Sequence, residues 1–446
     1  MRRSSAAMAL KGLCGGAVHL PGDPTYDLAR AAWNTAADQR PAAVAYPADA
    51  AEVAAVVRAA RSVGLRVAPQ GTGHHAAALG ALNDAVLVRT AAMTGVSVDR
   101  RARRARVGAG MLWADVVPRL SPLTALHPVA PDVGVAGYSL SGGLSWYGRC
   151  LGLQSSSVTA IEVVTADGTQ VRTDAGHDPD LFWALRGGGA NFGIVTGLEF
   201  ALHAVGEVHA GLLAWDWTRA ESILPRWIAW AANAPETVTT SLRITRMSSV
   251  APPELRGRRL VVIDGAVLGP APSVLAELRA LRPEVDTFAA VAPAALLRLH
   301  LEPEGPRALR LDSVLLGELG PAAVDAFLAT AGPGPGTTLR TVELRQLGGA
   351  LARPDPAGGA VSHVDGSFLL VAASEENGTQ GADDVRLVLA AMAPFATGRR
   401  YLGLSADQDD GEAGFDPDAW SRLRKIRSAV DPDQLFIASH PIPPVS

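Results

Sequence analysis

The stretch Gln70-Gly71-Thr72-Gly73-His74-His75 sets two histidines in glycine-rich backbone and decides how the rest of the chain is interpreted. Two further loops with few side chains follow it, Pro131-Asp132-Val133-Gly134 and Ser141-Gly142-Gly143. Glycine tolerates positive φ and lets main-chain N–H groups approach a ligand closely, so such loops suit a large anionic cofactor. A histidine in that wall is a candidate covalent or orienting partner of the cofactor.

Length and composition indicate a globular protein with two domains. The chain has 446 residues, more than one hydrophobic core usually organises, and it is 48% hydrophobic and 19% charged. The formal net charge of -4 argues against a nucleic-acid partner. The dense basic run Arg100-Arg101-Ala102-Arg103-Arg104 is interpreted as a solvated hairpin rather than a phosphate-binding patch.

Cysteine usage and hydropathy exclude several other classes. Cys14 and Cys150 are too few for a disulfide framework and lack metal-ligand spacing, so no metal site is predicted. No apolar stretch reaches membrane-spanning length, and no membrane partner is expected. Met1-Arg2-Arg3 is compatible with a secretion signal, but Lys11 interrupts the apolar region and no clear cleavage site follows. We therefore expect a cytoplasmic enzyme.

Strands and helices alternate in the first 200 residues. Asp49 is expected to cap a helix that ends at Gly64. Asp167-Gly168 between two β-branched runs predicts a hairpin with a two-residue turn, and Asp178 is expected to cap a short helix. The expected strands span 43–46, 65–68, 85–89, 96–99, 105–108, 161–166, 169–173 and 192–200, and a helix is expected over 111–120.

After about residue 205 the elements become longer, and strand pairs separated by single helices favour an α+β domain with one antiparallel sheet. The expected strands span 237–247, 258–268, 309–316, 337–347 and 367–372, and the helices span 271–281, 322–331 and 382–395. Asp416 is expected to cap a last helix, which Asp431-Pro432 stops. Phe436 to His440 is expected to return to the first domain.

In this order the segments resemble the FAD-linked oxidases of the berberine bridge enzyme-like family, which share a PCMH-type flavin-binding fold with vanillyl-alcohol oxidase. Beside the three loops quoted above, the resemblance is carried by residues 149–153, 163–168, 180–196, 420–423, 431–432 and 435–436. It is dense from about 24 to 205 and thin from 205 to 335. The string from Asp180 to Thr196 is the most specific part.

The resemblance implies an α+β protein with a two-domain PCMH-type FAD-binding fold and a substrate domain of antiparallel sheet plus helices. We expect the FAD-binding domain over residues 1–205 and the substrate-binding α+β domain over 206–398. A C-terminal segment over 399–446 is then expected to return to the FAD domain.

FAD is the implied cofactor, and the family implies a covalent bond from a histidine to the 8α carbon of the flavin. His74 occupies that position. Many members add a cysteinyl link one residue before the position of Pro131, where this chain has Ala130, so no cysteinyl link is expected. The residues expected to contact FAD are Gln70, Gly71, Thr72, Gly73, His74, His75, Pro131, Asp132, Val133, Gly134, Gly137, Tyr138, Gly142, Gly143, Gly193, Ile194, Val195, Tyr401 and His440.

The substrate side departs from the family pattern. Tyr401-Leu402-Gly403-Leu404 stands where members often carry Tyr-x-Asn-Tyr or Tyr-x-Asn-Phe, and Leu144 replaces a tyrosine that is catalytic in some members. The usual phenolate base is therefore absent. Glu343 and His363 are the candidate bases, and Tyr138 is a candidate for stacking on the cofactor or donating to the substrate. The alternatives are solvent-facing strand positions for Glu343 and His363 and core packing for Tyr138.

The histidine loop has other interpretations. Residues 71–76 also match a Rossmann dinucleotide pattern, but Pro69 separates the strand from the loop and Gly80 breaks a following helix. An ordinary satisfied loop histidine stays an alternative for His74, and a simple hydrogen bond stays one for His75.

These observations predict an FAD-dependent oxidase that moves a hydride from a small molecule to flavin N5. The substrate is expected to be an alcohol or a C–H group of a natural product or sugar, with O2 as acceptor giving H2O2. Two alternatives stay open: a redox-neutral cyclisation, or a dehydrogenase with a non-oxygen acceptor. Alanine-, arginine- and proline-rich usage indicates a bacterial gene, compatible with secondary metabolism. The sequence predicts neither the substrate nor the oligomeric state.

Overall fold

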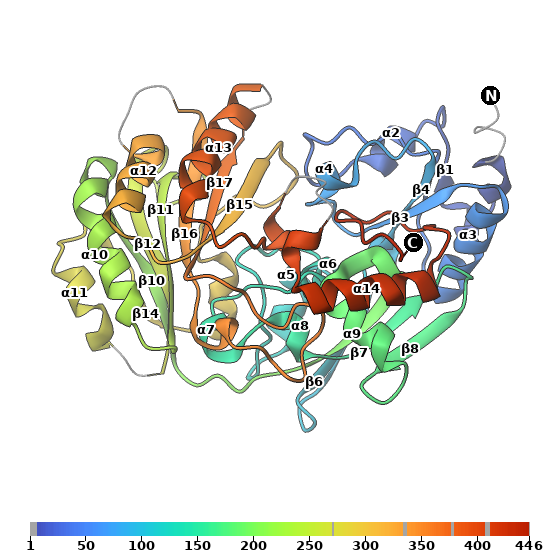
Figure 1. Ribbon diagram of the computed structural model, residues 1–446, viewed down its shortest axis with the longest axis horizontal. Helices are drawn as coiled ribbons and strands as arrows, with labels where there is room; N and C mark the ends of the chain where they lie inside the picture. The colour runs from blue at the N-terminus through green and yellow to red at the C-terminus, as the bar shows by residue number, and fades with distance from the viewer. Residues whose placement is uncertain (1–6, 270–271, 333–336, 376–378, 406–410, 446) are drawn as a thin grey trace.

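The computed structural model describes residues 7–269, 272–332, 337–375, 379–405 and 411–445. Within these residues the strands form sheets of four, five and eight strands. The two smaller sheets lie on the side of the N-terminus, and the eight-stranded sheet lies on the other side (Figure 1). Loops and short helices, including α7 and α8, fill the space between the two sides.

The four-stranded sheet carries the histidine loop. Its order is β1-β2-β4-β3, with bounds Val18–His19, Ala43–Ala45, Ala85–Arg89 and Arg66–Gln70, and β2, β4 and β3 run parallel. Helix α3 (Ala50–Ser62) connects β2 to β3. It begins where predicted, because the Asp49 carboxylate accepts a hydrogen bond from the Glu52 N–H at 2.9 Å.

The five-stranded sheet is antiparallel, and the predicted hairpin is confirmed in it. Its order is β5-β6-β9-β7-β8, with bounds Val96–Asp99, Arg104–Gly108, Ile194–Ala201, Val158–Val164 and Gln170–Asp174. The turn between β7 and β8 needs the glycine of Asp167-Gly168, whose φ is +82°. Helices α9 (Pro179–Gly188) and α14 (Pro417–Val430) pack together beside this sheet.

The eight-stranded antiparallel sheet contains the remaining strands. Its order is β13-β10-β12-β11-β16-β17-β15, with β14 beside β10. The bounds are β10 Val208–Asp216, β11 Val238–Arg246, β12 Arg259–Leu268, β13 Val285–Asp286, β14 Ala289–Val291, β15 Arg310–Leu316, β16 Leu339–Gln346 and β17 Phe368–Ser374. Helices α10 (Ala220–Asn233), α12 (Pro321–Ala331) and α13 (Thr379–Met392) cover its outer face (Figure 1), where the largest apolar cluster lies.

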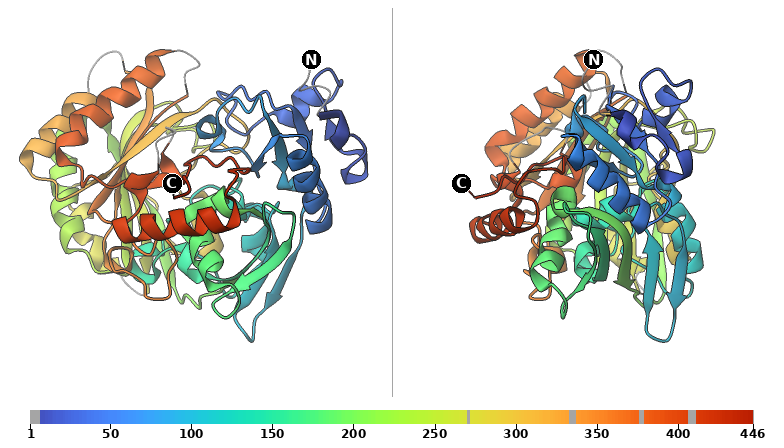
Figure 2. Two further views of the ribbon diagram at one scale, coloured as in Figure 1. Left: turned by 45° about the vertical axis from the view of Figure 1, so that its right-hand side comes forward. Right: turned by 90° about the vertical axis from the view of Figure 1, so that its right-hand side faces the viewer.

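The other helices are short. They are α2 Tyr26–Arg30, α4 Ala76–Leu79, α5 Trp113–Val116, α6 Val135–Leu140, α7 Gly148–Leu151, α8 Gln154–Ser157 and α11 Ala276–Arg279. Of these, α7 contacts β11 of the large sheet. Figure 2 shows the small sheets near the N-terminus and the large sheet from two further directions.

The C-terminal segment returns to the first sheet, as predicted. The Val67 N–H donates to the Leu435 carbonyl and the Ile437 N–H donates to the Val67 carbonyl, each at 2.8 Å. The three sheets span residues 18–201 and 208–374. The domain boundaries at 205 and 398 stay predictions.

Some predicted elements differ from the structure. Asp416 precedes α14, but its side chain pairs with Arg399 instead of capping the helix. The helix expected over 111–120 is only α5 followed by a 3₁₀ turn, Val117–Arg119, because Pro118 interrupts the hydrogen-bond ladder. Of the helix expected over 271–281, residue 271 lies outside the described residues, and α11 is a single turn after a 3₁₀ segment, Pro272–Leu275.

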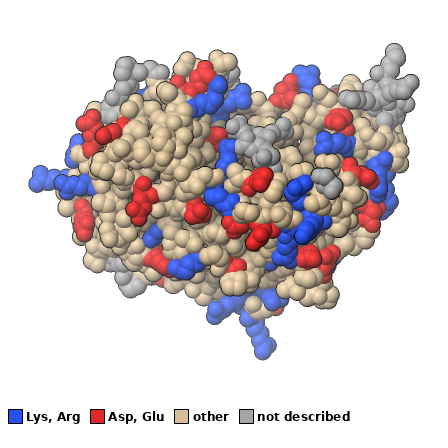
Figure 3. Space-filling view, viewed as in Figure 1, with Lys and Arg blue, Asp and Glu red and all other residues tan. Residues whose placement is uncertain are grey.

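Acidic and basic side chains are interspersed on the face drawn in Figure 3. The arginine run 100–104 lies at the exposed tip of the β5–β6 hairpin, as predicted. Among the described residues, no helix combines the length and the apolar character needed to cross a bilayer. The same residues contain no group of three or more His, Cys, Asp or Glu side chains arranged to hold a metal ion.

Candidate cofactor and substrate site

The histidine loop follows directly from β3. Gly73 adopts φ +89°, and a Cβ on it would lie 2.8 Å from the Ala32 Cβ and 3.1 Å from the Gln70 Oε1. Only glycine fits this position without strain. The loop then ends in the short helix α4, so His74 and His75 are held between a strand end and a helix start.

His74 is held by three contacts. Its ring stacks on Trp33, with centroids 3.9 Å apart and planes 16° apart. Its Nδ1 lies 2.7 Å from the Thr72 hydroxyl, and its Nε2 lies 3.9 Å from the Asp132 Oδ1. Burial lowers the pKa of His74 to about 4, against a raising effect of Asp132. The imidazole is therefore neutral at pH 7, so one of its ring nitrogens carries no proton, as a nucleophile requires.

Two other predicted residues beside His74 are engaged within the protein. Gln70 is buried, donates to the Gln39 Oε1 at 2.9 Å and accepts from Arg89 at 2.5 Å. The ring of His75 lies edge-on to that of His440, with centroids 6.4 Å apart. Burial lowers the pKa of both His75 and His440, and that of His440 falls to about 4.

The Pro131–Gly134 loop lies against the histidine loop. A Cβ on Gly134 would lie 3.6 Å from the Thr72 Cγ2, and Asp132 contacts His74 as described above. Val133 belongs to the same loop, and its carbonyl accepts a hydrogen bond from the Trp113 N–H at 3.0 Å. The next glycine, Gly137, is exposed and has no atom within 4 Å of a Cβ placed on it. This part of the main chain is open to a ligand.

Two tyrosines meet at the Gly142-Gly143 turn. The Tyr138 hydroxyl donates to the Leu144 carbonyl at 2.7 Å, and the Tyr401 hydroxyl accepts from the Gly143 N–H at 3.0 Å. Both glycines have positive φ, and a Cβ on Gly142 would lie 3.3 Å from the Tyr401 ring. Burial raises the pKa of Tyr401 to about 12 and that of Tyr138 well above 10, so both are neutral phenols at pH 7.

Gly193, Ile194 and Val195 lie at the start of β9. A Cβ on Gly193 would lie 2.4 Å from the Val163 Cγ2, which makes close packing against β7 the visible reason for this glycine. Ile194 and Val195 are buried in apolar clusters. The contact of these three residues with FAD stays a prediction.

Charged residues are buried on the inner face of the large sheet. Glu343 on β16 is 5% exposed and pairs with Arg345, whose Nε lies 2.9 Å from the Glu343 Oε1. The interpretation of Glu343 as a solvent-facing strand residue is therefore wrong, because both faces of β16 are covered. Burial alone would raise the pKa of Glu343, but Arg345, His300 and Arg243 overcome it and lower the pKa to about 2.

The pair is part of a larger group that spans three strands. Arg243 on β11 lies opposite Glu343 in the β11–β16 register and forms an ion pair with Asp264 on β12. His300 lies between the two acids, with its Nε2 3.7 Å from the Asp264 Oδ1 and 3.9 Å from the Glu343 Oε1. Arg345 also affects the tyrosines of the Gly142-Gly143 turn. Burial raises the pKa of Tyr138 and Tyr401, and the positive charge of Arg345 opposes part of that rise. The inner face of the sheet thus adjoins the Gly142-Gly143 turn.

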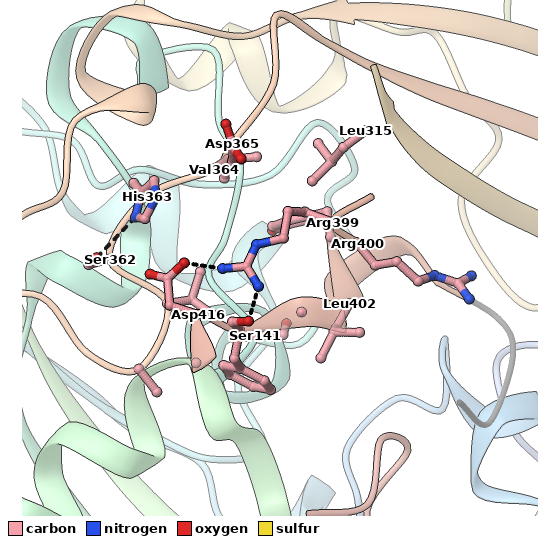
Figure 4. Close-up of a pocket in the computed structure, with 16 residues that line it drawn as sticks. Ser141, Leu315, Ser362, His363, Val364, Asp365, Arg399, Arg400, Leu402 and Asp416 are labelled. Atoms are coloured by element: carbon pink, nitrogen blue, oxygen red, sulfur yellow. Dashed lines mark hydrogen bonds and ion pairs between the residues drawn. The ribbon is translucent and has the colours of Figure 1, made fainter. Parts of the chain in front are cut away.

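A cavity lies behind Tyr401, between the large sheet and the C-terminal segment. It is shallow and open to solvent. Figure 4 shows that Ser141, His363, Asp365 and Arg400 line it. His363 is half-buried in the loop before β17, with its Nδ1 3.2 Å from the Ser362 hydroxyl. It lines this cavity from a loop and not from the strand that holds Glu343, and its role as a base stays a prediction.

The residues present fit FAD. Main chain is exposed at Gly71 and Gly137, and within the described residues the buried Ser139 Oγ and His440 Nδ1 have no hydrogen-bond partner. Such atoms are rare in folded proteins unless a ligand or water satisfies them. Trp33, Arg243, Asp264, His300 and Arg345 were not predicted as site residues. For Arg345 a signal existed, because it follows Glu343 at the two-residue spacing that places side chains on one face of a strand.

Comparison with known proteins bears on the fold and on the cofactor. The model of the FAD binding domain matches residues 41–174. The chain is 31% identical over 206 residues to (R)-6-hydroxynicotine oxidase of Paenarthrobacter nicotinovorans, covering 45% of this chain and 44% of that protein. Among solved structures, Physcomitrella patens BBE-like 1 has a TM-score of 0.83 at 22% identity, covering 98% and 99% of the two chains. Xylooligosaccharide oxidase from Myceliophthora thermophila, solved with xylobiose, has a TM-score of 0.82 at 22% identity, covering 98% and 100%.

The first curated relatives share only part of their length with this chain, since the alignments span 27 to 44% of those proteins. The structural matches extend over nearly the whole chain and confirm the α+β fold with its PCMH-type architecture. The chain therefore contains an FAD binding domain and has the fold of the berberine bridge enzyme-like FAD-linked oxidases, which confirms the resemblance drawn from its sequence.

Proposed function

We propose that this protein is an FAD-dependent oxidase of a small molecule, with FAD bonded to His74 and O2 as the acceptor that yields H2O2. The observation that carries the proposal is the His74 imidazole, which Trp33 and Thr72 hold against the Pro131–Gly134 loop. When bound, FAD supplies the two-electron acceptor for hydride transfer. Relatives named for hydroxynicotine and for xylooligosaccharides support a polar small-molecule substrate.

In this proposal Glu343 holds the substrate and accepts its proton. Because its pKa is about 2, the carboxylate stays ionised at neutral pH and accepts a hydrogen bond from a substrate hydroxyl or amine. An alcohol hydroxyl becomes far more acidic as the hydride leaves its carbon, so even a weakly basic carboxylate can take its proton. His363, which lines the same cavity as Tyr401, is the candidate for passing the proton to solvent. Tyr138 positions the Gly142-Gly143 turn through its bond to the Leu144 carbonyl.

A redox-neutral cyclisation is the second candidate, because the phenolate base on which related oxidases rely is missing. Tyr138 and Tyr401 both have raised pKa values, so neither offers a phenolate for alcohol oxidation at neutral pH. Anaerobic mixing with candidate alcohols and amines separates the reactions. Bleaching followed by peroxide on admission of O2 indicates an oxidase. Product without bleaching indicates the redox-neutral reaction, and bleaching with slow reoxidation indicates a dehydrogenase.

The covalent link is tested by acid precipitation of the purified protein. Yellow colour that stays in the pellet of wild type and is lost to the supernatant in His74→Ala supports the link. His75→Ala is the matched control, because it removes the neighbouring imidazole and is expected to keep the flavin in the pellet. Flavin released by acid from wild type contradicts the covalent link.

A further inference from the structure

The wall around His74 contains a carboxylate that the proposed hydride transfer does not use. The side chain of Asp132 is 14% exposed. Its Oδ2 accepts hydrogen bonds from the Trp33 Nε1 at 2.7 Å and from the Gly305 N–H at 2.8 Å. Its Oδ1 faces the His74 Nε2 at 3.9 Å. One oxygen is thus fixed by two donors, while the other is left facing the imidazole.

Trp33 links this carboxylate to the histidine. The indole donates to Asp132 through its N–H and stacks on His74 through its ring. The main chain at Trp33 also supports the histidine loop, because the Trp33 N–H donates to the Thr72 carbonyl at 2.9 Å. His74, Trp33 and Asp132 therefore form one unit in which the imidazole cannot turn without breaking the stack.

A segment that precedes β15 holds this unit from the other side. The Arg307 N–H donates to the Trp33 carbonyl and the Thr35 N–H donates to the Arg307 carbonyl, each at 3.0 Å. The Arg307 guanidinium lies over the Trp33 ring at 5.0 Å from its centroid. Gly305, which donates to Asp132, belongs to the same segment. The segment that leads into β15 of the large sheet therefore fixes the Asp132 carboxylate beside His74.

We propose that Asp132 is a positioning residue for the attachment of FAD to His74: its carboxylate orients the imidazole and stabilises the positive charge that forms when an imidazole nitrogen is alkylated. This inference rests on the covalent link of the proposed function. A neutral imidazole that gains a bond to carbon becomes a cation until it loses its remaining N–H proton. A carboxylate fixed close to the ring lowers the energy of that cation and can receive the proton.

Attachment releases two protons and transfers two electrons to the flavin. A bond forms between an imidazole nitrogen and the flavin 8α carbon, one proton leaves that carbon and one leaves the imidazole. The flavin keeps the electron pair of the broken C–H bond and so gains two electrons. Dioxygen then takes up two electrons and two protons as hydrogen peroxide, which returns the flavin to its oxidised state. Asp132 orients the imidazole and stabilises the cationic stage without being consumed, so it affects the rate of attachment and not its products.

The test measures attachment rather than turnover. Apoprotein is produced in a riboflavin-starved host and supplied with FAD, and acid-stable flavin is measured over time. Asp132→Asn can still accept both fixed hydrogen bonds but carries no charge. We expect it to bind FAD as tightly as wild type before attachment and to attach it at least tenfold more slowly. Asp132→Glu, which restores a carboxylate, is expected to recover most of the rate.

The outcomes separate this inference from the proposed function. Wild type that holds its flavin covalently, together with Asp132→Asn that attaches it equally fast, overturns the role of Asp132 alone. A slow Asp132→Glu variant that binds FAD normally also overturns it, because the charge would then not be the cause. Wild type that releases all its flavin in acid overturns the covalent link and this inference with it.

Discussion

Replacing Glu343 by glutamine removes the acid on which the inner face of the large sheet depends. The pKa of Glu343 is lowered from 4.5 to about 2. A shift of one pKa unit corresponds to about 1.36 kcal/mol, so the fold favours the carboxylate by about 3 kcal/mol. Removing one member of a buried ion pair costs roughly 3–5 kcal/mol, because the partner charge stays buried. Glu343→Gln is therefore expected to lower the free energy of unfolding by about 3 kcal/mol at pH 7.

The pH dependence of this effect has a defined sign. The folded pKa of Glu343 lies below its unfolded value, so the stabilisation is fully present above about pH 4.5. It is lost as the pH falls from about 4.5 to about 2. Because glutamine does not titrate, the difference in stability between wild type and Glu343→Gln should shrink across that window.

Urea unfolding followed by tryptophan fluorescence measures this difference. Glu254→Gln is the matched control, because Glu254 is exposed, and it should change stability by less than about 0.5 kcal/mol. Replacing both Glu343 and Arg345 by leucine should recover part of the loss, because no charge is then left unpaired. A Glu343→Gln variant as stable as the control would refute the reasoning.

Two further predictions concern the FAD side. Gly73→Ala is expected to abolish FAD uptake, because its Cβ would lie 2.8 Å from Ala32 at a φ that alanine rarely adopts, whereas Gly206→Ala, with open space around the new Cβ, should bind FAD normally. The flavin-to-protein ratio by absorbance checks both. Burial raises the pKa of Cys14 to about 12, so iodoacetamide at pH 8 should label Cys150 and spare Cys14 in the native protein. Peptide mass spectrometry checks this, and equal labelling of both thiols contradicts it.

Local patterns predicted the fold where hydrogen bonds are local. Asp49 caps α3 and Asp167-Gly168 turns the β7–β8 hairpin, because both signals act within a few residues. The same rule failed at Asp416, because Arg399 competes for its carboxylate. That competition depends on tertiary structure, so the sequence of the helix start alone does not reveal it.

The candidate site was only partly predictable, for the same reason. The glycines of the histidine loop could be recognised in the sequence, because the backbone conformation at Gly73 requires a residue without a Cβ. Trp33 gave no signal, because its role depends on Asp132 and Arg307, which are distant in the chain. Glu343 was predicted as a base, and that role stays a prediction. Its lowered pKa could not be predicted, since Arg243 and His300 come from other parts of the sheet domain.

A series of ion pairs connects the surroundings of His74 with the surroundings of Glu343. Arg307, which lies over Trp33, approaches Glu375 at 3.7 Å, and Arg340 contacts Glu375 at 3.3 Å and Glu302 at 3.1 Å. Glu302 then lies 3.7 Å from Arg243, the strand neighbour of Glu343. Acids and arginines alternate along this path, so each charge is compensated by its neighbours. Most of these side chains are partly exposed, so a shift of the large sheet relative to His74 would separate a network of partly screened ion pairs. We infer that this network helps to hold His74, the proposed flavin anchor, at a constant distance from Glu343, the proposed proton acceptor.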